Sequence, residues 1–312
     1  MTGLPAKLKD YTIKEQQKLL SRILISDLSF LKYMELFDEV EDELPLTEMF
    51  VDSVLQPGNK DSFSPKGVAS FKARIGKVRS CKVDFLLTPK QITAMWKSYI
   101  GKINKSTREN VYDAPFQQYI INKIGEKLKN ELQLTALYKG VYDEAGSGAA
   151  DVFDGLLTKL KVAGVVKAAN IAAGAPVTDA NAIAEFEKVA DLVPAEYVNE
   201  DLVALVNPNY AKFYNRDYRA TYGANTANTS GFNKSIIDGT NIEIIAEPAL
   251  AGTNGLLITP RNNFAWLCDS MRKVDAFIIE KAERNIKVMI DFEAAPEVSI
   301  AELVWTNDLT LV

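Results

Sequence analysis

A long apolar ridge in the middle of the chain limits most strongly what this sequence can fold into. Five apolar side chains recur at steps of four residues, the spacing that places them on one face of an α-helix: Phe116, Ile120, Ile124, Leu128 and Leu132. Asp113 can cap such a helix, and Pro115 suits its first turn. The pattern predicts one helix over residues 114–142, about 42 Å long. A helix so much longer than the usual ~12 residues is typical of a support for a wide, flat structure or of a helix bundle, with a plain core helix as the alternative.

The charge pattern before this helix changes sign abruptly. Residues 34–59 hold eight acidic residues and no Lys or Arg, and residues 62–83 hold six basic residues and no acid. A run of one sign is typical of a solvated face. The alternative is that the acidic segment of one subunit lies against the basic segment of a neighbour, where complementary charge sets register and partner choice. In that case we expect these residues to make the contact: Glu41, Asp42, Glu43, Lys72, Arg74, Lys77 and Arg79.

The basic segment is predicted to be extended. Charged and apolar residues alternate over residues 71–75, and the alternation changes phase at Gly76. Alternation predicts a strand, and the change of phase at a glycine predicts a β-bulge. Thr88 and Pro89 then predict the N-cap and first turn of a helix that Gly101 closes.

Helical patterns fill the middle of the chain and strand patterns fill its end. Residues 11–37 predict one or two amphipathic helices. Residues 202–206 predict a short buried strand, and Asn207 with Pro208 predicts the start of a helix. That helix carries tyrosines at steps of four, which favours a half-buried face over base stacking: Tyr210, Tyr214, Tyr218 and Tyr222. Several strands follow from residue 241, and this order of elements predicts the α+β class.

Composition excludes several classes of function. The chain has no histidine, so Ser-His-Asp and Cys-His nucleophiles, histidine metal sites and imidazole proton shuttles are excluded. Cys81 and Cys268 lie far apart with no other thiol, so we expect neither a disulfide framework nor a zinc site. A net charge of −5 argues against coating nucleic acid by overall charge. No apolar stretch reaches the ~20 residues of a membrane span. We therefore expect no cofactor and no membrane partner.

Four segments, in this order, carry a resemblance to a known family: the basic strand region from Phe71 to Val83, the helix from Ala114 to Tyr142, Val152-Phe-Asp-Gly-Leu-Leu-Thr-Lys-Leu160, and the segment from Leu205 to Arg219. The chain resembles the major capsid proteins of tailed bacteriophages, which have the Hong Kong 97-like fold. In that family a long spine helix precedes a Phe-Asp-Gly-Leu-Leu entry into a second domain. The resemblance implies an N-terminal arm (1–56), an extended loop region (57–103), a peripheral domain with the spine helix (104–150), an axial domain (151–262), and return strands of the peripheral domain with a C-terminal strand (263–312).

The resemblance implies a structural function and no enzymatic activity. Copies would self-assemble as hexamers and pentamers of an icosahedral shell that encloses phage double-stranded DNA without sequence-specific binding. Scaffolding, portal and decoration proteins are the further partners that it suggests. The protein would belong to the virion capsid and assemble in the cytoplasm of the host bacterium. An encapsulin-type nanocompartment shell is the alternative, because it uses the same fold, although the long arm and elongated loop favour a virion. A carboxylate-based hydrolase is a distant alternative.

Overall fold

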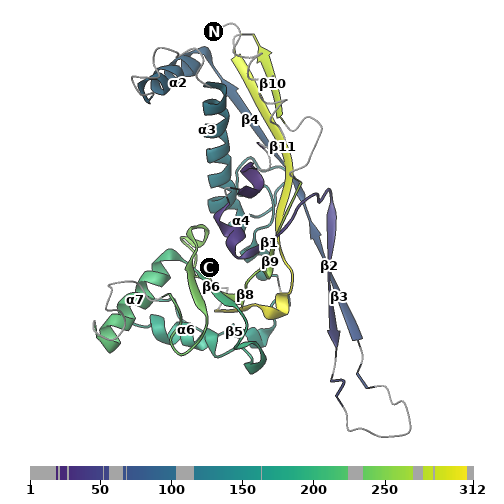
Figure 1. The fold of residues 1–312 in the computed structure, drawn as a ribbon, viewed down its shortest axis with the longest axis vertical. Coiled ribbons are helices and arrows are strands. Elements are labelled where there is room, and N and C mark those ends of the chain that lie inside the picture. The colour runs from purple at the N-terminus through teal and green to yellow at the C-terminus, as the bar shows by residue number, and fades with distance from the viewer. Residues whose placement is uncertain are drawn as a thin grey trace.

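Two β-sheets, a long helix and a projecting hairpin organise the protein (Figure 1). The structure, a computed structural model, describes residues 19, 22–26, 28–51, 53–55, 66–67, 69–102, 116–162, 164–223, 235–269, 277–283 and 285–307. Helices and strands alternate irregularly along these residues, which confirms the predicted α+β class.

The first sheet is built around the long strand β11 (Asn285–Val298). Strand β4 (Arg79–Leu87) pairs with it antiparallel from Ile286↔Leu87 to Ala294↔Arg79. On the opposite edge of β11, Ile286 to Ile290 pair with β10 (Phe277–Ala282), and Ala294 pairs with β9 (Phe264–Cys268). Strands β10 and β9 therefore lie one after the other along this edge. Strand β1 (Met34–Phe37) pairs parallel to β9. The result is a long, narrow sheet.

The predicted long helix lies along the first sheet (Figure 1). It consists of α3 (Phe116–Glu131), a π-helical turn η4 (Leu132–Ala136) and α4 (Leu137–Lys139) in unbroken succession. The residues of the predicted ridge whose side chains are described, Ile120 to Leu132, are buried. The helix ends three residues before the predicted Tyr142, and its predicted start at Ala114 lies outside the described residues.

Two predictions near the first sheet have different outcomes. Helix α2 (Pro89–Lys102) begins as predicted, since the Thr88 N–H donates to Gln91 Oε1 at 2.9 Å and the Gln91 N–H donates to Thr88 Oγ1 at 3.4 Å. It runs one residue past Gly101. The helical prediction for residues 11–37 is wrong at its end: Met34–Phe37 is the strand β1, whose backbone hydrogen bonds are made with β9. Earlier in that range the structure has two short helical turns, η1 (Arg22–Ser26) and η2 (Ser29–Lys32), and most of residues 11–21 lie outside the described residues.

The second sheet has the strand order β5 (Ile171–Ala172), β12 (Trp305–Asn307), β8 (Leu256–Pro260), β6 (Leu202–Val206) and β7 (Glu243–Ala246). Helices α6 (Ala182–Ala190) and α7 (Pro208–Tyr222) pack beside it (Figure 1). All of β6 is buried, as predicted. The remaining short turns are η1 (Arg22–Ser26), η2 (Ser29–Lys32), α5 (Leu156–Leu160), η5 (Ala168–Asn170), η6 (Ala195–Tyr197), η7 (Pro248–Leu250) and η8 (Ala301–Leu303).

The tyrosine ridge of α7 belongs to the core of the second sheet. Asn207 caps the helix by accepting the Asn209 N–H at 3.0 Å. Tyr210, Tyr214 and Tyr218 are buried, and only Tyr222 is substantially exposed. The half-buried face is therefore confirmed, because a buried ring cannot stack on a base.

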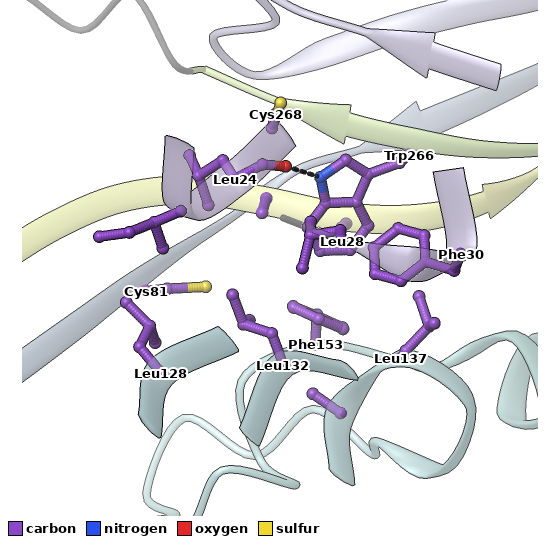
Figure 2. Packing of buried hydrophobic residues seen from close by; sticks show 14 of the residues in the cluster. Leu24, Leu28, Phe30, Cys81, Leu128, Leu132, Leu137, Phe153, Trp266 and Cys268 are labelled. Carbon is purple, nitrogen blue, oxygen red and sulfur yellow. Dashed lines mark hydrogen bonds between the residues drawn. The ribbon is translucent and has the colours of Figure 1, made fainter. Parts of the chain in front are cut away.

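The main core lies between the first sheet and the long helix, around Trp266 (Figure 2). The indole meets Phe30 edge-on with ring centroids 5.1 Å apart, and Phe153 at 6.0 Å. Its Nε1–H donates to the Leu24 carbonyl at 3.1 Å. One side chain of β9 thus joins the N-terminal segment to the Phe-Asp-Gly phrase that follows the long helix.

Two glycines let the backbone cross at the end of the long helix. The Gly155 N–H donates to the Gly140 carbonyl at 2.9 Å. A Cβ at Gly155 would lie 2.5 Å from the Tyr138 carbonyl carbon, and one at Gly140 would lie 2.4 Å from the Phe153 carbonyl oxygen. The Phe-Asp-Gly-Leu-Leu phrase therefore needs its glycine because two backbone segments touch there.

We expect Gly155→Ala to lower the free energy of unfolding by about 1–3 kcal/mol, the usual cost of overpacking. The added methyl would clash with backbone atoms, which cannot move away by changing rotamer as a side chain can. Gly255→Ala is the control, because its added methyl would meet atoms no closer than 3.5 Å. Urea denaturation of both variants measures the difference. If Gly155→Ala and Gly255→Ala have the same free energy of unfolding, the close backbone contact at Gly155 would be contradicted.

A buried carboxylate joins the two sheets. Glu247, between β7 and η7, accepts a hydrogen bond from the Tyr33 hydroxyl and one from the Ala249 N–H at 3.2 Å. The Tyr138 hydroxyl at the end of the long helix lies 3.4 Å from that of Tyr33. Burial raises the pKa of Glu247 above its ordinary value, and the two hydrogen bonds offset only part of this. Burial also raises the pKa of Tyr33 and of Tyr138.

We expect Glu247 to make the unfolding free energy fall as pH rises. The folded protein binds the proton of this carboxyl more tightly than the unfolded chain does. Its contribution is therefore largest below the ordinary pKa of 4.5 and declines as pH rises through the raised value. Glu247→Gln, which does not titrate, is the reference. Urea denaturation at a series of pH values should show the wild-type stability relative to this variant decreasing with pH. An increase would mean that the hydrogen bonds outweigh burial.

Candidate assembly interface

The hairpin of β2 (Glu43–Val51) and β3 (Ala69–Lys77) projects away from both sheets (Figure 1). The two strands pair antiparallel through nine residue pairs, from Glu43↔Lys77 to Val51↔Ala69. Together they form a two-stranded sheet that includes no other described strand. Parts of the acidic segment and of the basic segment are thus partners within one chain. The predicted boundary at residues 56/57 lies outside the described residues, between β2 and β3 in the sequence.

The β-bulge predicted at Gly76 is wrong. The register runs through Ile75↔Pro45, Gly76↔Leu44 and Lys77↔Glu43 without an extra residue. Gly76 instead fits closely against the first sheet: a Cβ there would lie 2.6 Å from Leu267 Cδ1, a side-chain atom that would have to shift. The change of phase needs no extra residue, because Lys77 lies on the same exposed face of β3 as Ile75.

A small apolar cluster supports the base of the hairpin, by which we mean the pairs from Leu46↔Arg74 to Glu43↔Lys77. It consists of the buried residues Val40, Val78, Ala265 and Leu267, with Phe37 and Leu44 packed against them. The Val78 N–H donates to the Asp42 carbonyl at 3.0 Å. This cluster is separate from the cores of the two sheets, so the base rests on few apolar contacts.

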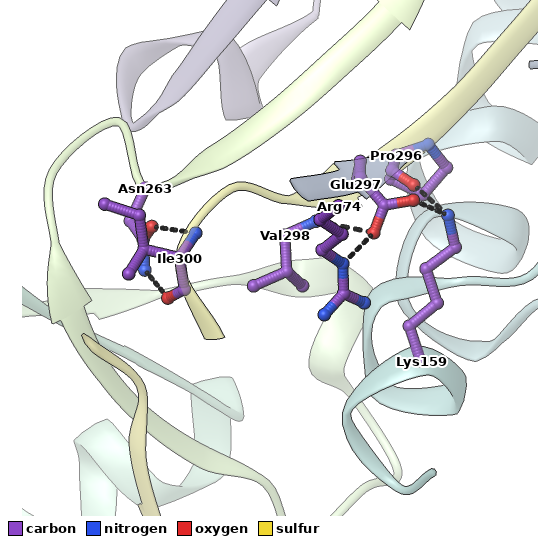
Figure 3. A network of polar contacts seen from close by, with 7 residues as sticks. All are labelled: Arg74, Lys159, Asn263, Pro296, Glu297, Val298 and Ile300. Carbon is purple, nitrogen blue, oxygen red and sulfur yellow. Dashed lines mark hydrogen bonds and ion pairs between the residues drawn. The ribbon is translucent and has the colours of Figure 1, made fainter. Parts of the chain in front are cut away.

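An ion-pair network lies beside the same base (Figure 3). Glu297 of β11, with its side chain 5% exposed, binds Arg74 Nε at 2.9 Å and Lys159 Nζ at 2.6 Å. Its Oε1 also accepts the Val298 N–H at 3.0 Å, and Lys159 donates to the Pro296 carbonyl at 2.7 Å. The carboxylate thereby connects the hairpin, the first sheet and α5.

The other predicted contact residues have modest roles within the chain. Lys77 and Glu43 form an ion pair of 3.1 Å, both about half exposed, and such a pair contributes about 0–1 kcal/mol. The Arg79 guanidinium carbon lies 4.0 Å from the centre of the Tyr142 ring. Lys72 stands opposite Glu48 in the register.

Glu41 and Asp42 are exposed just before β2. A role for the seven predicted residues between subunits stays a prediction.

Apolar side chains are exposed on the hairpin. Ile75 is 58% exposed, Val54 59% and Leu55 86%. Single exposed apolar residues are common on protein surfaces. Here they lie on an element that carries little of either core, which is the arrangement expected of a contact surface.

Sequence reasoning missed Glu297 and Lys159. Lys159 belongs to the phrase Phe153-Asp-Gly-Leu-Leu-Thr-Lys159, but nothing in that phrase marks it as a partner of β3. Glu297 stands 223 residues from Arg74. The one available signal was that Glu297 interrupts a largely apolar run at the end of β11.

Two other kinds of site are not found in the part of the chain that the structure describes. No group of three or more His, Cys, Asp or Glu side chains is placed to hold a metal ion. None of the described helices combines the length and the apolar character needed to cross a membrane.

Comparison with known proteins identifies the fold. Neither the family models nor the curated protein sequences match the chain. Its fold is similar to a chain of the satellite phage P4 procapsid including size determination (Sid) protein, with a TM-score of 0.60, 14% identity, and coverage of 94% of this chain and 98% of that one. It is similar to the capsid of a native GTA particle (TM-score 0.58, 11% identity, 89% of each chain).

A similar likeness extends to the holo-SrpI encapsulin complex of Synechococcus elongatus PCC 7942 (TM-score 0.51, 11% identity, 90% of this chain and 86% of that one). Each of the three likenesses extends over about nine tenths of the chain or more. The protein therefore has the Hong Kong 97-like fold of phage capsid shells.

Proposed function

We propose that this protein is a major capsid protein, whose copies self-assemble into the icosahedral shell of a tailed bacteriophage around its double-stranded DNA. The observation that carries the proposal is the β2–β3 hairpin, which projects from a chain with the fold of shell proteins and exposes apolar side chains. In a closed array each subunit meets several neighbours, so many weak contacts add up to a stable shell.

The proposed role is structural and needs no cofactor. Hexamers and pentamers of the chain would form the shell in the cytoplasm of the host bacterium. Scaffolding, portal and decoration proteins would be further partners, and the packaged DNA would be enclosed without sequence-specific binding. The chain has a net charge of −5. Because DNA is also negatively charged, this supports a shell that adheres only weakly to the packaged DNA.

An encapsulin-type nanocompartment is the second candidate, because an encapsulin subunit shares the fold at a TM-score of 0.51. The phage-related likeness is stronger, at 0.60 with almost complete coverage of both chains. The two candidates differ in what the shell contains.

Electron microscopy and light scattering of the purified protein, expressed alone and with its neighbouring genes, test the proposal. Closed shells, or ring-shaped hexamers and pentamers, are the expected result. Packaged DNA would support the virion, and a packaged enzyme would support the nanocompartment. A monomer in both preparations would overturn a shell-forming function.

A further inference from the structure

We propose that Glu297 fixes the direction of the β2–β3 hairpin by binding Arg74 of the hairpin and Lys159 of α5 at once. The meaning of this for assembly rests on the proposed function, since a hairpin must point toward its neighbour to contact it. The direction itself is a property of the single subunit.

The network lies where it can set the direction of the hairpin. Beyond its base, β2 and β3 pair with each other and with no other described strand. The direction of the whole hairpin is therefore set where it joins the body. Arg74 lies in this base, opposite Leu46, and its guanidinium reaches the buried Glu297 carboxylate.

The network adds ionic contacts to the apolar support of the base. Loss of Arg74 would leave the buried Glu297 carboxylate with one cationic partner in place of two, which is unfavourable for a buried charge. The accompanying cluster contains only four buried side chains. Gly76 adds a close fit, since a Cβ there would lie 2.6 Å from Leu267 Cδ1. Rotation of the hairpin at its base would have to break the Arg74–Glu297 pair first.

Lys159 connects this base to the segment after the long helix. Its Nζ donates to both Glu297 and the Pro296 carbonyl. Lys159 lies four residues after Gly155, the residue at which the backbone crosses the end of the long helix. A displacement of α5 would therefore change the binding of Glu297 and, through Arg74, the direction of the hairpin.

Distances between two spin labels measure this direction. Leu55→Cys places one label on the hairpin, and Lys127→Cys places the other on the exposed face of α3. The native Cys81 and Cys268 are buried, and burial raises the pKa of Cys81 to about 12, so they react slowly with the label. Labelled chains diluted with unlabelled chains report distances within one subunit, whether or not shells form.

Three substitutions break the network: Glu297→Gln, Arg74→Met and Lys159→Met. We expect Glu297→Gln and Arg74→Met to widen the distance distribution roughly twofold, because the base gains freedom to rotate. Lys159→Met should widen it less, since Arg74 still binds Glu297. Lys77→Met is the matched control: it lies three residues from Arg74 on the same strand, but its partner Glu43 belongs to the hairpin itself. Its distribution should equal that of the wild type.

Unchanged distributions in Arg74→Met and Glu297→Gln, with only a lower unfolding temperature, would overturn the inference and leave the network a simple stabilising contact. If Glu297→Gln does not fold, Arg74→Met and Lys159→Met decide. The result is separable from the proposed function: a chain that forms no shells can still show a hairpin held by Glu297, and shells can form around a hairpin that Glu297 does not hold.

Discussion

Shortening the β2–β3 hairpin is expected to leave a folded subunit that no longer closes into shells. Replacing residues 47–73 by Asn-Gly joins Leu46 to Arg74, which already face each other in the register, through a two-residue turn suited to a hairpin. The base, its apolar cluster and the Arg74–Glu297 pair all remain. Because the deleted part pairs with no other described strand, the unfolding free energy should stay near that of the wild type, while the yield of closed shells falls to background.

Electron microscopy and sedimentation measure shell yield, and circular dichroism checks the fold. A point variant sharpens the test: Ile75→Asp places a charge on an apolar side chain that is 58% exposed, and it should reduce shell yield strongly. Ile75→Val keeps an apolar β-branched side chain and should assemble normally. Closed shells at wild-type yield from the shortened chain would remove the hairpin from assembly.

Replacing Trp266 by alanine is expected to cost about 3–5 kcal/mol of unfolding free energy, the range for a large aromatic side chain removed from a core. The indole is fully buried between the first sheet and the long helix. Its loss opens a cavity beside Phe30 and Phe153 and leaves the Leu24 carbonyl without its donor. Urea denaturation of unassembled subunits measures the cost, since assembly would itself stabilise the folded chain.

Trp266→Phe is the control for this core. It keeps an aromatic ring against Phe30 but removes the Nε1–H that binds the Leu24 carbonyl. We expect it to be clearly less destabilising than the alanine variant. If Trp266→Phe and Trp266→Ala lower the unfolding free energy equally, then the hydrogen bond to the Leu24 carbonyl, rather than packing of the ring, holds the N-terminal segment to β9.

Local patterns in the sequence were enough to predict the elements that have a regular period. The apolar steps of four from Phe116 to Leu132 predicted the long helix, and the Asn207 cap and tyrosine spacing predicted α7. Burial selects one face of a helix at a fixed spacing, so neighbouring residues carry the signal. The order of such elements also carried the resemblance to capsid proteins, and the likeness in fold confirms it.

Contacts between distant parts of the chain had no such signal. The sequence showed an acidic segment and a basic segment, but no periodic pattern within either one indicates that they pair as β2 and β3. Met34–Phe37 became a strand because β9 offered it backbone partners about 230 residues later. Gly76 lies close against Leu267, and Arg74 binds Glu297, 223 residues away.

These contacts place the hairpin, and so the proposed interface. Each joins groups that are far apart in the sequence, because an ion pair, a backbone hydrogen bond or a close packing contact is defined by separation in space. Periodicity along the chain records which face of an element is buried, and so it identified the long helix and β6. Periodicity does not record which element lies against that face. The contacts at the base of the hairpin were therefore seen only in the tertiary structure.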